Sequence, residues 1–170
     1  MKFKLLRYIA YTLEIIVFYV LEQTPRFVPE VFGAKPLLLL PIIIMIALFE
    51  GERVALGFGI FIGVLLDSSF SWNLGFYAIT IPILGYILGL ISRNIIKNTF
   101  PTAMIVSALS IFSIYTLHFL IYYVLSGFIY TLYAYFFHYL PNIFYTLFTC
   151  ILFYYFNKAF AAIIREEVIK

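Results

Sequence analysis

The feature that most constrains the fold is the division of the chain into long apolar segments by short polar links. Hydrophobic residues make up 65% of the 170 residues and charged residues only 11%, against about 45–50% and about 25% in soluble domains. A helix needs about 20 apolar residues to cross a bilayer, so this length accommodates about five or six spans. The composition predicts one all-α integral membrane domain over residues 1–170, and it excludes a soluble core or a separate soluble domain.

Six apolar segments fit this expectation, and the third is unusually short. The segments cover about residues 5–21, 36–49, 54–66, 74–91, 101–125 and 141–164. The 13 residues of the third segment would form a helix of about 20 Å, whereas the hydrocarbon core is about 30 Å thick. We therefore expect Asp67 and the turn that follows it to lie below the membrane surface, where irregular backbone must be buried in protein or line a wet cavity.

The basic residues predict the orientation in the membrane. In a six-span arrangement, nine of the eleven Lys and Arg residues fall on one side, and only Arg26 and Lys35 fall on the other. Basic residues are enriched in cytoplasmic loops, so we expect a multi-pass protein of the inner (plasma) membrane with both termini in the cytoplasm. The basic residues form no block, and this argues against a nucleic-acid partner.

Two further segments carry structural predictions. Residues 127–140 are rich in Tyr and Phe and contain no Lys, Arg, Asp or Glu, which is typical of a segment at the membrane interface. Pro82 lies inside the fourth apolar segment and predicts a kink there.

Small residues recur at helical spacing in the third and fourth segments. Ala55, Gly59 and Gly63 are four residues apart, as are Gly85 and Gly89, so each set lies on one helix face. Such faces allow the backbones of membrane helices to approach closely. The pattern predicts helix–helix packing, either within the subunit or with a helix of a partner. Neither set has the Lys and Ser or Thr of a phosphate loop.

Two acids lie within apolar surroundings, where an ionised carboxylate must face protein or be protonated. Asp67, with Gly75 farther along the same turn, is interpreted as a polar anchor of the turn after the third segment. It could accept N–H bonds from the turn Ser68–Trp72, pair with a partner or bind a substrate, or it could simply end the segment. Glu14 lies near the middle of the first segment. It is interpreted either as part of a proton relay or polar contact inside the bundle, or as an acid that is hydrogen-bonded to a neighbouring tyrosine or to the backbone.

Catalytic and metal-binding patterns are weak. His118 and His138 are isolated in the sequence, and Cys150 is the single cysteine, so no metal site and no cofactor are predicted. A triad of Asp67, His138 and Ser68 or Ser69 can be drawn, but no nucleophile motif supports it. The sequence therefore predicts a protein that is not an enzyme.

The motif around Asp67 also resembles that of a known family. Gly63-Val-Leu-Leu-Asp67, then Leu74-Gly75-Phe76-Tyr77-Ala78, and then Gly85-Tyr86-x-x-Gly89 resemble the hallmark runs of the MreD family. The leucine run Pro36–Leu40 is similar to the second span of that family. The turn 68–73 departs from the family pattern, because it has Phe70 and Trp72 where small residues and a proline are usual.

The resemblance implies a non-enzymatic component of the bacterial cell-elongation machinery. MreD proteins act with MreC, the MreB cytoskeleton, RodA and a class B penicillin-binding protein in cell-shape determination and lateral peptidoglycan synthesis. Their fold is similar to that of the S components of energy-coupling-factor vitamin transporters. The resemblance thus implies a scaffold that binds MreC. Membrane lipid and a second copy of the same chain, in a homodimer, are the other partners considered.

Two other functions remain open at this point. The first is a substrate-binding S component of a vitamin transporter, although the first segment has only Ala10, with Glu14 four residues later, where such proteins often carry an A-x-x-x-A face. The second is a membrane enzyme that acts on a lipid through Asp67.

Overall fold

The computed structural model describes residues 2–24, 27, 29, 35–69, 75–94, 99–125, 127 and 131–166. Every regular element within these residues is a helix, which confirms the all-α class. The elements are α1 (Lys2–Gln23), α2 (Leu39–Glu50), α3 (Glu52–Ser69), α4 (Phe76–Asn94), α5 (Phe100–Phe119), the π-helix η1 (Leu120–Val124), α6 (Thr131–Ala134), the π-helix η2 (Tyr135–Tyr139) and α7 (Leu140–Glu166).

Several helices have the length and apolarity of membrane spans. Among the described residues, three stretches qualify on both grounds, Phe76–Arg93, Phe100–Val124 and Tyr135–Ala159. The apolar helix α2 has only 12 residues. The helices α1 and α3 have 22 and 18 residues, but both include charged side chains. Three of the described helices are thus long and apolar enough to cross a membrane, and the count of six spans stays a prediction.

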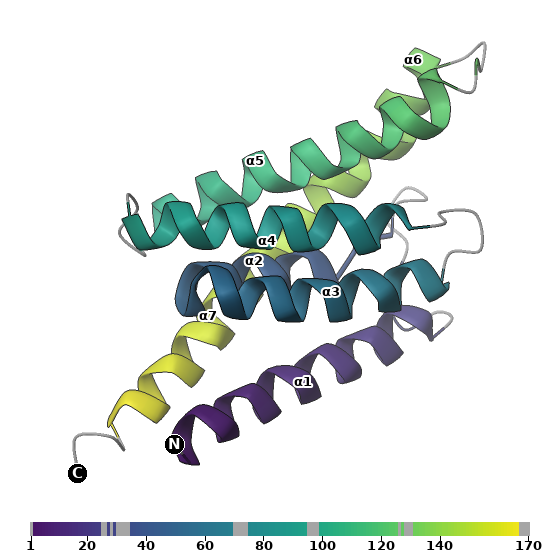
Figure 1. Ribbon diagram of the computed structural model, residues 1–170. Helices are drawn as coiled ribbons and strands as arrows, with labels where there is room; N and C mark the ends of the chain where they lie inside the picture. The colour runs from purple at the N-terminus through teal and green to yellow at the C-terminus, as the bar shows by residue number, and fades with distance from the viewer. Residues whose placement is uncertain are drawn as a thin grey trace.

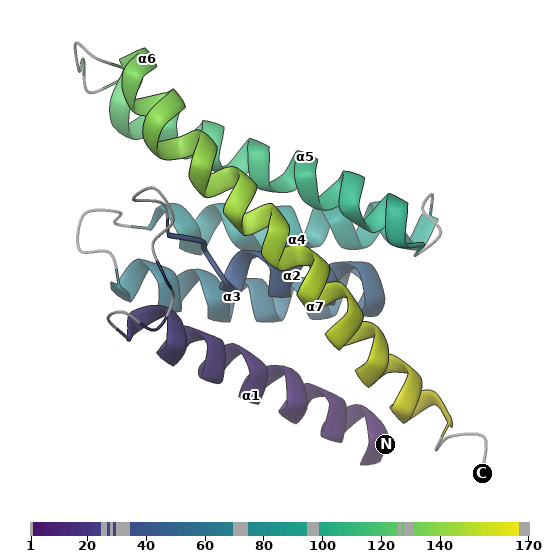
Figure 2. The same cartoon turned by 180° about the vertical axis from the view of Figure 1, so that it is seen from behind.

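Helix α2 forms the centre of the bundle. Its residues 39–48 are all buried, and the helix contacts α1, α3, α4, α5 and α7. Helices α3 and α4 face the viewer in Figure 1. Helix α7 crosses the opposite side of the bundle, which faces the viewer in Figure 2. A helix that is apolar all round is stable when protein surrounds it. The uniformly apolar sequence of α2 is explained by this position.

The ends of the helices define two ends of the bundle. The start of α1, the turn between α2 and α3, the end of α4, the start of α5 and the end of α7 lie together at one end (Figure 1). We call it the charged end, because it carries Arg7, Glu50, Glu52, Arg53 and Arg93. Helices α3 and α4 run side by side between the two ends, whereas α1 diverges from α3 toward the charged end (Figure 1).

The predicted length of the third segment was wrong. Helix α3 continues through Asp67 to Ser69 and has 18 residues, which corresponds to about 27 Å. Asp67 therefore lies in the last turn of a helix, and it does not begin a turn after a short one. The helix continues because its polar C-terminal side chains have local partners: Ser68 and Ser69 both donate hydrogen bonds to the carbonyl oxygen of Leu65.

The predicted boundary before Pro141 was also wrong. Residues 131–139 are helical and lead directly into α7, so the described part of the aromatic segment is no separate interfacial element. Proline has no N–H to donate to the carbonyl four residues earlier. The π-helical turn Tyr135–Tyr139 directly precedes this position, and Leu140 donates to the carbonyl of Tyr135. A π-turn is a usual way to absorb such an interruption without ending the helix.

Candidate functional site: the α3–α4 pair and the charged end

The glycine-bearing face of α3 packs directly on α4. A Cβ atom at Gly59 would lie 2.8 Å from the Cα of Pro82, and one at Gly63 would lie 2.7 Å from the Cα of Ala78, whereas real Cβ contacts are essentially never below 3.0 Å. Pro82 is inside α4 and does not end it. Only glycine allows the two backbones to approach this closely.

The glycines of α4 complete the same interface from the other side. A Cβ at Gly85 would lie 3.1 Å from the carbonyl oxygen of Ala55, and one at Gly89 would overlap the backbone of Glu52. The structure thus places all four helix-packing glycines of the sequence prediction between α3 and α4. These glycines are occupied by packing within the chain, so a partner helix cannot use them without separating the pair.

Asp67 joins the end of α3 to the beginning of α4. Its Oδ1 accepts a hydrogen bond from the backbone N–H of Tyr77 at 3.0 Å, and its Oδ2 accepts one from Ala78 at 2.8 Å. Both N–H groups belong to the first turn of α4, where no backbone partner exists. A carboxylate at a helix N-terminus is also favoured by the helix dipole. Asp67 acts on α4 as a side-chain cap supplied by the neighbouring helix.

Gly75 precedes α4 and supports this geometry. Its φ is +82°, a conformation that glycine adopts at little cost, and its carbonyl oxygen accepts the N–H of Ile79. The sequence predicted N–H groups from the turn Ser68–Trp72 for Asp67, whereas the observed donors are Tyr77 and Ala78. Residues 70–72 of that turn lie outside the described residues.

Glu14 is buried, with 7% of its surface exposed, and it contacts α7. Asn157 donates a hydrogen bond from Nδ2 to Glu14 Oε1 at 3.1 Å, and the same amide nitrogen bonds to the carbonyl of Phe153. The partner of Glu14 is thus the side-chain amide of Asn157, whereas the sequence suggested a tyrosine or the backbone. This contact ties the first helix to the last.

A second buried acid, Glu22, was missed in the sequence. It is only 3% exposed, and its Oε2 accepts the N–H of Leu38 at 3.0 Å. The N–H of Leu37 bonds to Thr146 Oγ1 at 3.3 Å, and that of Lys35 bonds to Asn142 Oδ1 at 2.8 Å. Side chains from α1 and α7 therefore satisfy the backbone that precedes α2, as buried polar backbone requires. This explains why α2 begins at Leu39, three residues after the predicted start.

His118 lies in an aromatic cluster at the end opposite to the charged end. Its Nδ1 is 2.8 Å from the hydroxyl oxygen of Tyr139, and its ring packs against Phe76, Tyr77 and Tyr122. His138 is exposed on η2. Among the described residues, no three His, Cys, Asp or Glu side chains gather in a group that could hold a metal ion.

The structure does not assemble the triad that the sequence allowed. Both oxygens of Asp67 accept bonds from α4, and the hydroxyls of Ser68 and Ser69 donate to Leu65 and contact Tyr19. These side chains hold helix ends. None of the bonds described for them leads to a histidine, which a nucleophilic serine needs as its base.

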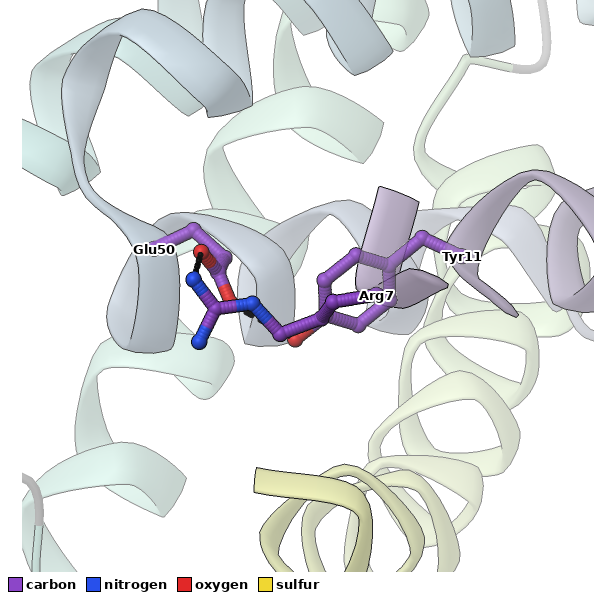
Figure 3. A network of polar contacts seen from close by, with 3 residues as sticks. All are labelled: Arg7, Tyr11 and Glu50. Atoms are coloured by element: carbon purple, nitrogen blue, oxygen red, sulfur yellow. Dashed lines mark hydrogen bonds and ion pairs between the residues drawn. The ribbon is translucent and has the colours of Figure 1, made fainter. Parts of the chain in front are cut away.

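The charged end holds an ion-pair network between α1 and α2. Arg7 Nη2 lies 2.6 Å from Glu50 Oε2, and the hydroxyl of Tyr11 donates to Glu50 Oε1 at 3.0 Å. Figure 3 shows the three side chains converging from the two helices. The Glu50 side chain is 4% exposed, so the ion pair is screened less by solvent than a surface pair. It fixes the start of α1 on the end of α2.

A second ion pair and a cavity lie beside this network. Arg93 Nη1 is 2.8 Å from Glu52 Oε1, and Ser92 donates to the carbonyl of Leu48 at 2.8 Å. A cavity of about 570 Å³ opens there. Its lining comprises Arg7, Tyr8, Leu48, Phe49, Glu50, Gly51, Glu52, Arg53, Val54, Ser92 and Arg93. Glu50–Arg53 falls in the short polar link between the second and third apolar segments of the sequence. The presence of Arg7 on the same predicted side was the signal for an ion pair.

Sequence comparison identifies the family to which this architecture belongs. The family of rod shape-determining protein MreD matches residues 2–163 of the 170-residue chain. The chain belongs to the MreD family. No curated protein and no solved structure matches it. Membership of the MreD family indicates a role in rod-shape determination and, together with the apolar helices, a membrane location.

Proposed function

We propose that this MreD-family chain is a non-enzymatic membrane component of the bacterial cell-elongation machinery, and that it acts as a scaffold that binds MreC. The observation that carries the proposal is the family match, which extends over residues 2–163. Contacts with MreB, RodA and a class B penicillin-binding protein, and a role in lateral peptidoglycan synthesis, belong to the same proposal.

The chemistry of the described residues supports a scaffold. Asp67 caps α4, Glu14 bonds to Asn157, and Glu22 holds the start of α2. These three carboxylates are thus used to assemble the bundle. The surface offered to other membrane proteins is apolar, and on α1 it includes Leu5, Leu6, Ile9, Leu13, Ile16, Val17 and Val20. A transmembrane helix of MreC, or a second copy of the chain, would pack on faces of this kind by shape and van der Waals contact.

The proposal includes six spans with both termini in the cytoplasm and a fold similar to that of transporter S components. The start of α1 and the end of α7 lie at the same end of the bundle (Figure 1), which supports an even number of crossings. The basic side chains Arg7, Arg53 and Arg93 lie at that end as well, as expected for the cytoplasmic side. No observation on the described residues favours the vitamin-transport alternative over the scaffold.

Co-isolation of MreC tests the proposal. The tagged chain is purified in mild detergent from membranes that contain MreC of the same bacterium, and MreC is expected in the eluate at a fixed ratio. Exposed-face variants then locate the contact: Leu13→Trp on α1 and Leu109→Trp on α5 change side chains that are 61% and 64% exposed. We expect one of them to release MreC while the thermal stability of the chain is unchanged.

The glycines are unsuitable for this test. A leucine at Gly63 would collide with the backbone of α4, so a loss of MreC in that variant would report misfolding. If MreC is absent from the eluate of the folded wild-type chain in several detergents, the scaffold proposal is refuted.

A further inference from the structure

The groove between α1 and α3 adjoins the cavity at the charged end. The groove has a volume of about 490 Å³ and is lined by Tyr8, Thr12, Arg53, Val54, Gly57, Phe58 and Phe61. Tyr8, Arg53 and Val54 also line the charged cavity. A mainly apolar channel along two helices therefore leads into a polar, charged space at the end of the bundle.

The groove exists because of two neighbouring residues on α3. Phe58 contacts α1, with its ring centroid 6.2 Å from that of Tyr8 and 5.9 Å from that of Tyr11. It keeps the two helices apart. The adjacent Gly57 has no side chain to fill the space that results, and a Cβ built on it meets nothing within 4 Å.

Gly57 is the unexplained glycine of this helix. Gly59 and Gly63 are required by the close approach of α4, whereas Gly57 has no such neighbour among the described residues. A glycine in the middle of a helix is less stable than alanine by about 0.8–1.0 kcal/mol. The open space above Gly57 is therefore retained at the expense of helix stability, which points to an occupant from outside the chain.

The charged residues where the groove meets the cavity indicate the charge of that occupant. Three arginines and two glutamates line the charged cavity. Among the described residues, the two glutamates form ion pairs with Arg7 and Arg93, and neither ion pair includes Arg53, which is exposed. The first N–H groups of the 18-residue helix α3 add partial positive charge at the same place. The junction of groove and cavity thus favours an anion.

Arg53, Gly57 and Phe61 share one face of α3, because they are four residues apart. Each step of four residues is about 6 Å along the helix. A charged group at Arg53 would therefore be followed by apolar contacts about 6 Å and about 12 Å farther along the helix. This is the order of parts in a phospholipid, with an anionic headgroup and an acyl chain.

We propose that the groove between α1 and α3 binds one anionic glycerophospholipid. Arg53 contacts the phosphate at the mouth of the charged cavity, and the acyl chain lies over Gly57 and against Phe61. Basic pockets between membrane helices bind anionic headgroups in the same manner. The lipid fills the space between the helices, and in doing so it couples the position of α1 to α3.

Lipid binding to the purified full-length chain tests the proposal. The chain in detergent is titrated with dioleoyl phosphatidylglycerol or dioleoyl phosphatidylcholine, and bound lipid is counted by native mass spectrometry. We expect one phosphatidylglycerol to bind more tightly than phosphatidylcholine. Arg53→Gln should weaken phosphatidylglycerol binding about fivefold, because one basic residue near a lipid surface contributes about 1 kcal/mol. Gly57→Leu should abolish the tight site by filling the groove.

Matched variants separate the groove from general effects. Lys158→Gln removes the same charge from α7, where Lys158 lies over the ring of Tyr154, and it should leave the affinity unchanged. Leu56→Phe adds apolar bulk at an exposed position of α3 outside the groove, turned about 100° around the helix from Gly57, and it should also have no effect. Thermal unfolding of each variant confirms that it is folded.

Three results would overturn the proposal. One is equal binding of the two lipids by the wild-type chain. Another is binding of inorganic phosphate that competes fully with the lipid, since this would identify a soluble anion. The third is a dimer that Gly57→Leu converts to a monomer with no change in lipid binding, since this would assign the groove to a second copy of the chain.

Discussion

Replacement of Asp67 by alanine should destabilise the bundle by removing the cap of α4. The carboxylate accepts two backbone N–H bonds, at 3.0 Å and 2.8 Å. A hydrogen bond to a charged group contributes about 1.5–3 kcal/mol, and loss of a helix cap costs about 0.5–2 kcal/mol. Because Asp67 is only partly buried, we take the lower part of these ranges. Asp67→Ala is then expected to lower the free energy of unfolding by about 2–3 kcal/mol.

Asp67→Asn separates the hydrogen bonds from the charge. Its amide oxygen accepts one of the two N–H groups, whereas the NH₂ group cannot accept the other. The favourable interaction of a carboxylate with the helix dipole, about 0.3–1 kcal/mol, is lost as well. We expect a loss of about 1–2 kcal/mol, between the wild type and Asp67→Ala.

Reversible unfolding in mixed detergent micelles, followed by circular dichroism, measures these values. Ser68→Ala is the matched control, because Ser68 is exposed, donates to the carbonyl of Leu65 within its own helix, and has only one exposed contact with another helix, at 3.3 Å from the hydroxyl of Tyr19. Its effect should stay below about 0.5 kcal/mol. Equal stability of Asp67→Ala and wild type would refute the capping role. A loss in Ser68→Ala as large as that in Asp67→Ala would refute it too.

Four further substitutions test the helix packing, the ion pair of Glu50 and the hydrogen bond of Glu22. Gly63→Leu should prevent the α3–α4 contact and leave little folded protein in size-exclusion chromatography, whereas Gly57→Ala, with nothing within 4 Å, should raise the stability by about 0.5–1 kcal/mol. Glu50→Gln removes the ion pair of Arg7 and should cost about 2–3 kcal/mol in the same unfolding assay, and an unchanged value would contradict the role of this pair. Glu22→Ala leaves the N–H of the residue that precedes α2 without its acceptor, and we expect a loss of about 1–3 kcal/mol together with faster amide exchange at the start of α2.

The sequence indicated close helix packing but not its partners. The spacing of Gly59, Gly63, Gly85 and Gly89 identifies two faces that admit another backbone, because the period of a helix is local information. Which backbone meets each face depends on the whole bundle. The structure resolves this by pairing the two faces with each other.

The position of Asp67 was harder to predict, because a polar residue in an apolar run can either end the helix or stay within it when its side chain has a hydrogen-bond partner. It was read as the point where the helix ends, and the helix instead continues to Ser69. The carboxylate could remain within the helix because α4 supplies two N–H groups ten and eleven residues later. A contact of this kind depends on how two helices are placed side by side, and no local pattern encodes it.

Contacts between distant segments were missed for the same reason. Glu22 reaches the start of α2, and Glu50 reaches α1. Each acid occurs at a helix end, where a solvent-exposed side chain is the usual expectation. Their burial follows from the central position of α2, which contacts five other helices. Glu22 accepts a backbone N–H at the start of α2, and Glu50 at its end is paired with Arg7, because polar groups at a buried helix end need partners.

Cell shape is the most direct test of the central claim, which is that the Asp67 motif assembles a scaffold for rod-shape determination and takes no part in a reaction. A rod-shaped bacterium whose own MreD is depleted would express the chain, or its Asp67→Asn variant, at equal membrane levels of folded protein. Rod shape should be restored by both, because the asparagine retains one capping bond and the bundle stays folded. Round cells with Asp67→Asn at wild-type folded levels would contradict the claim, since the carboxylate would then have a function beyond the fold.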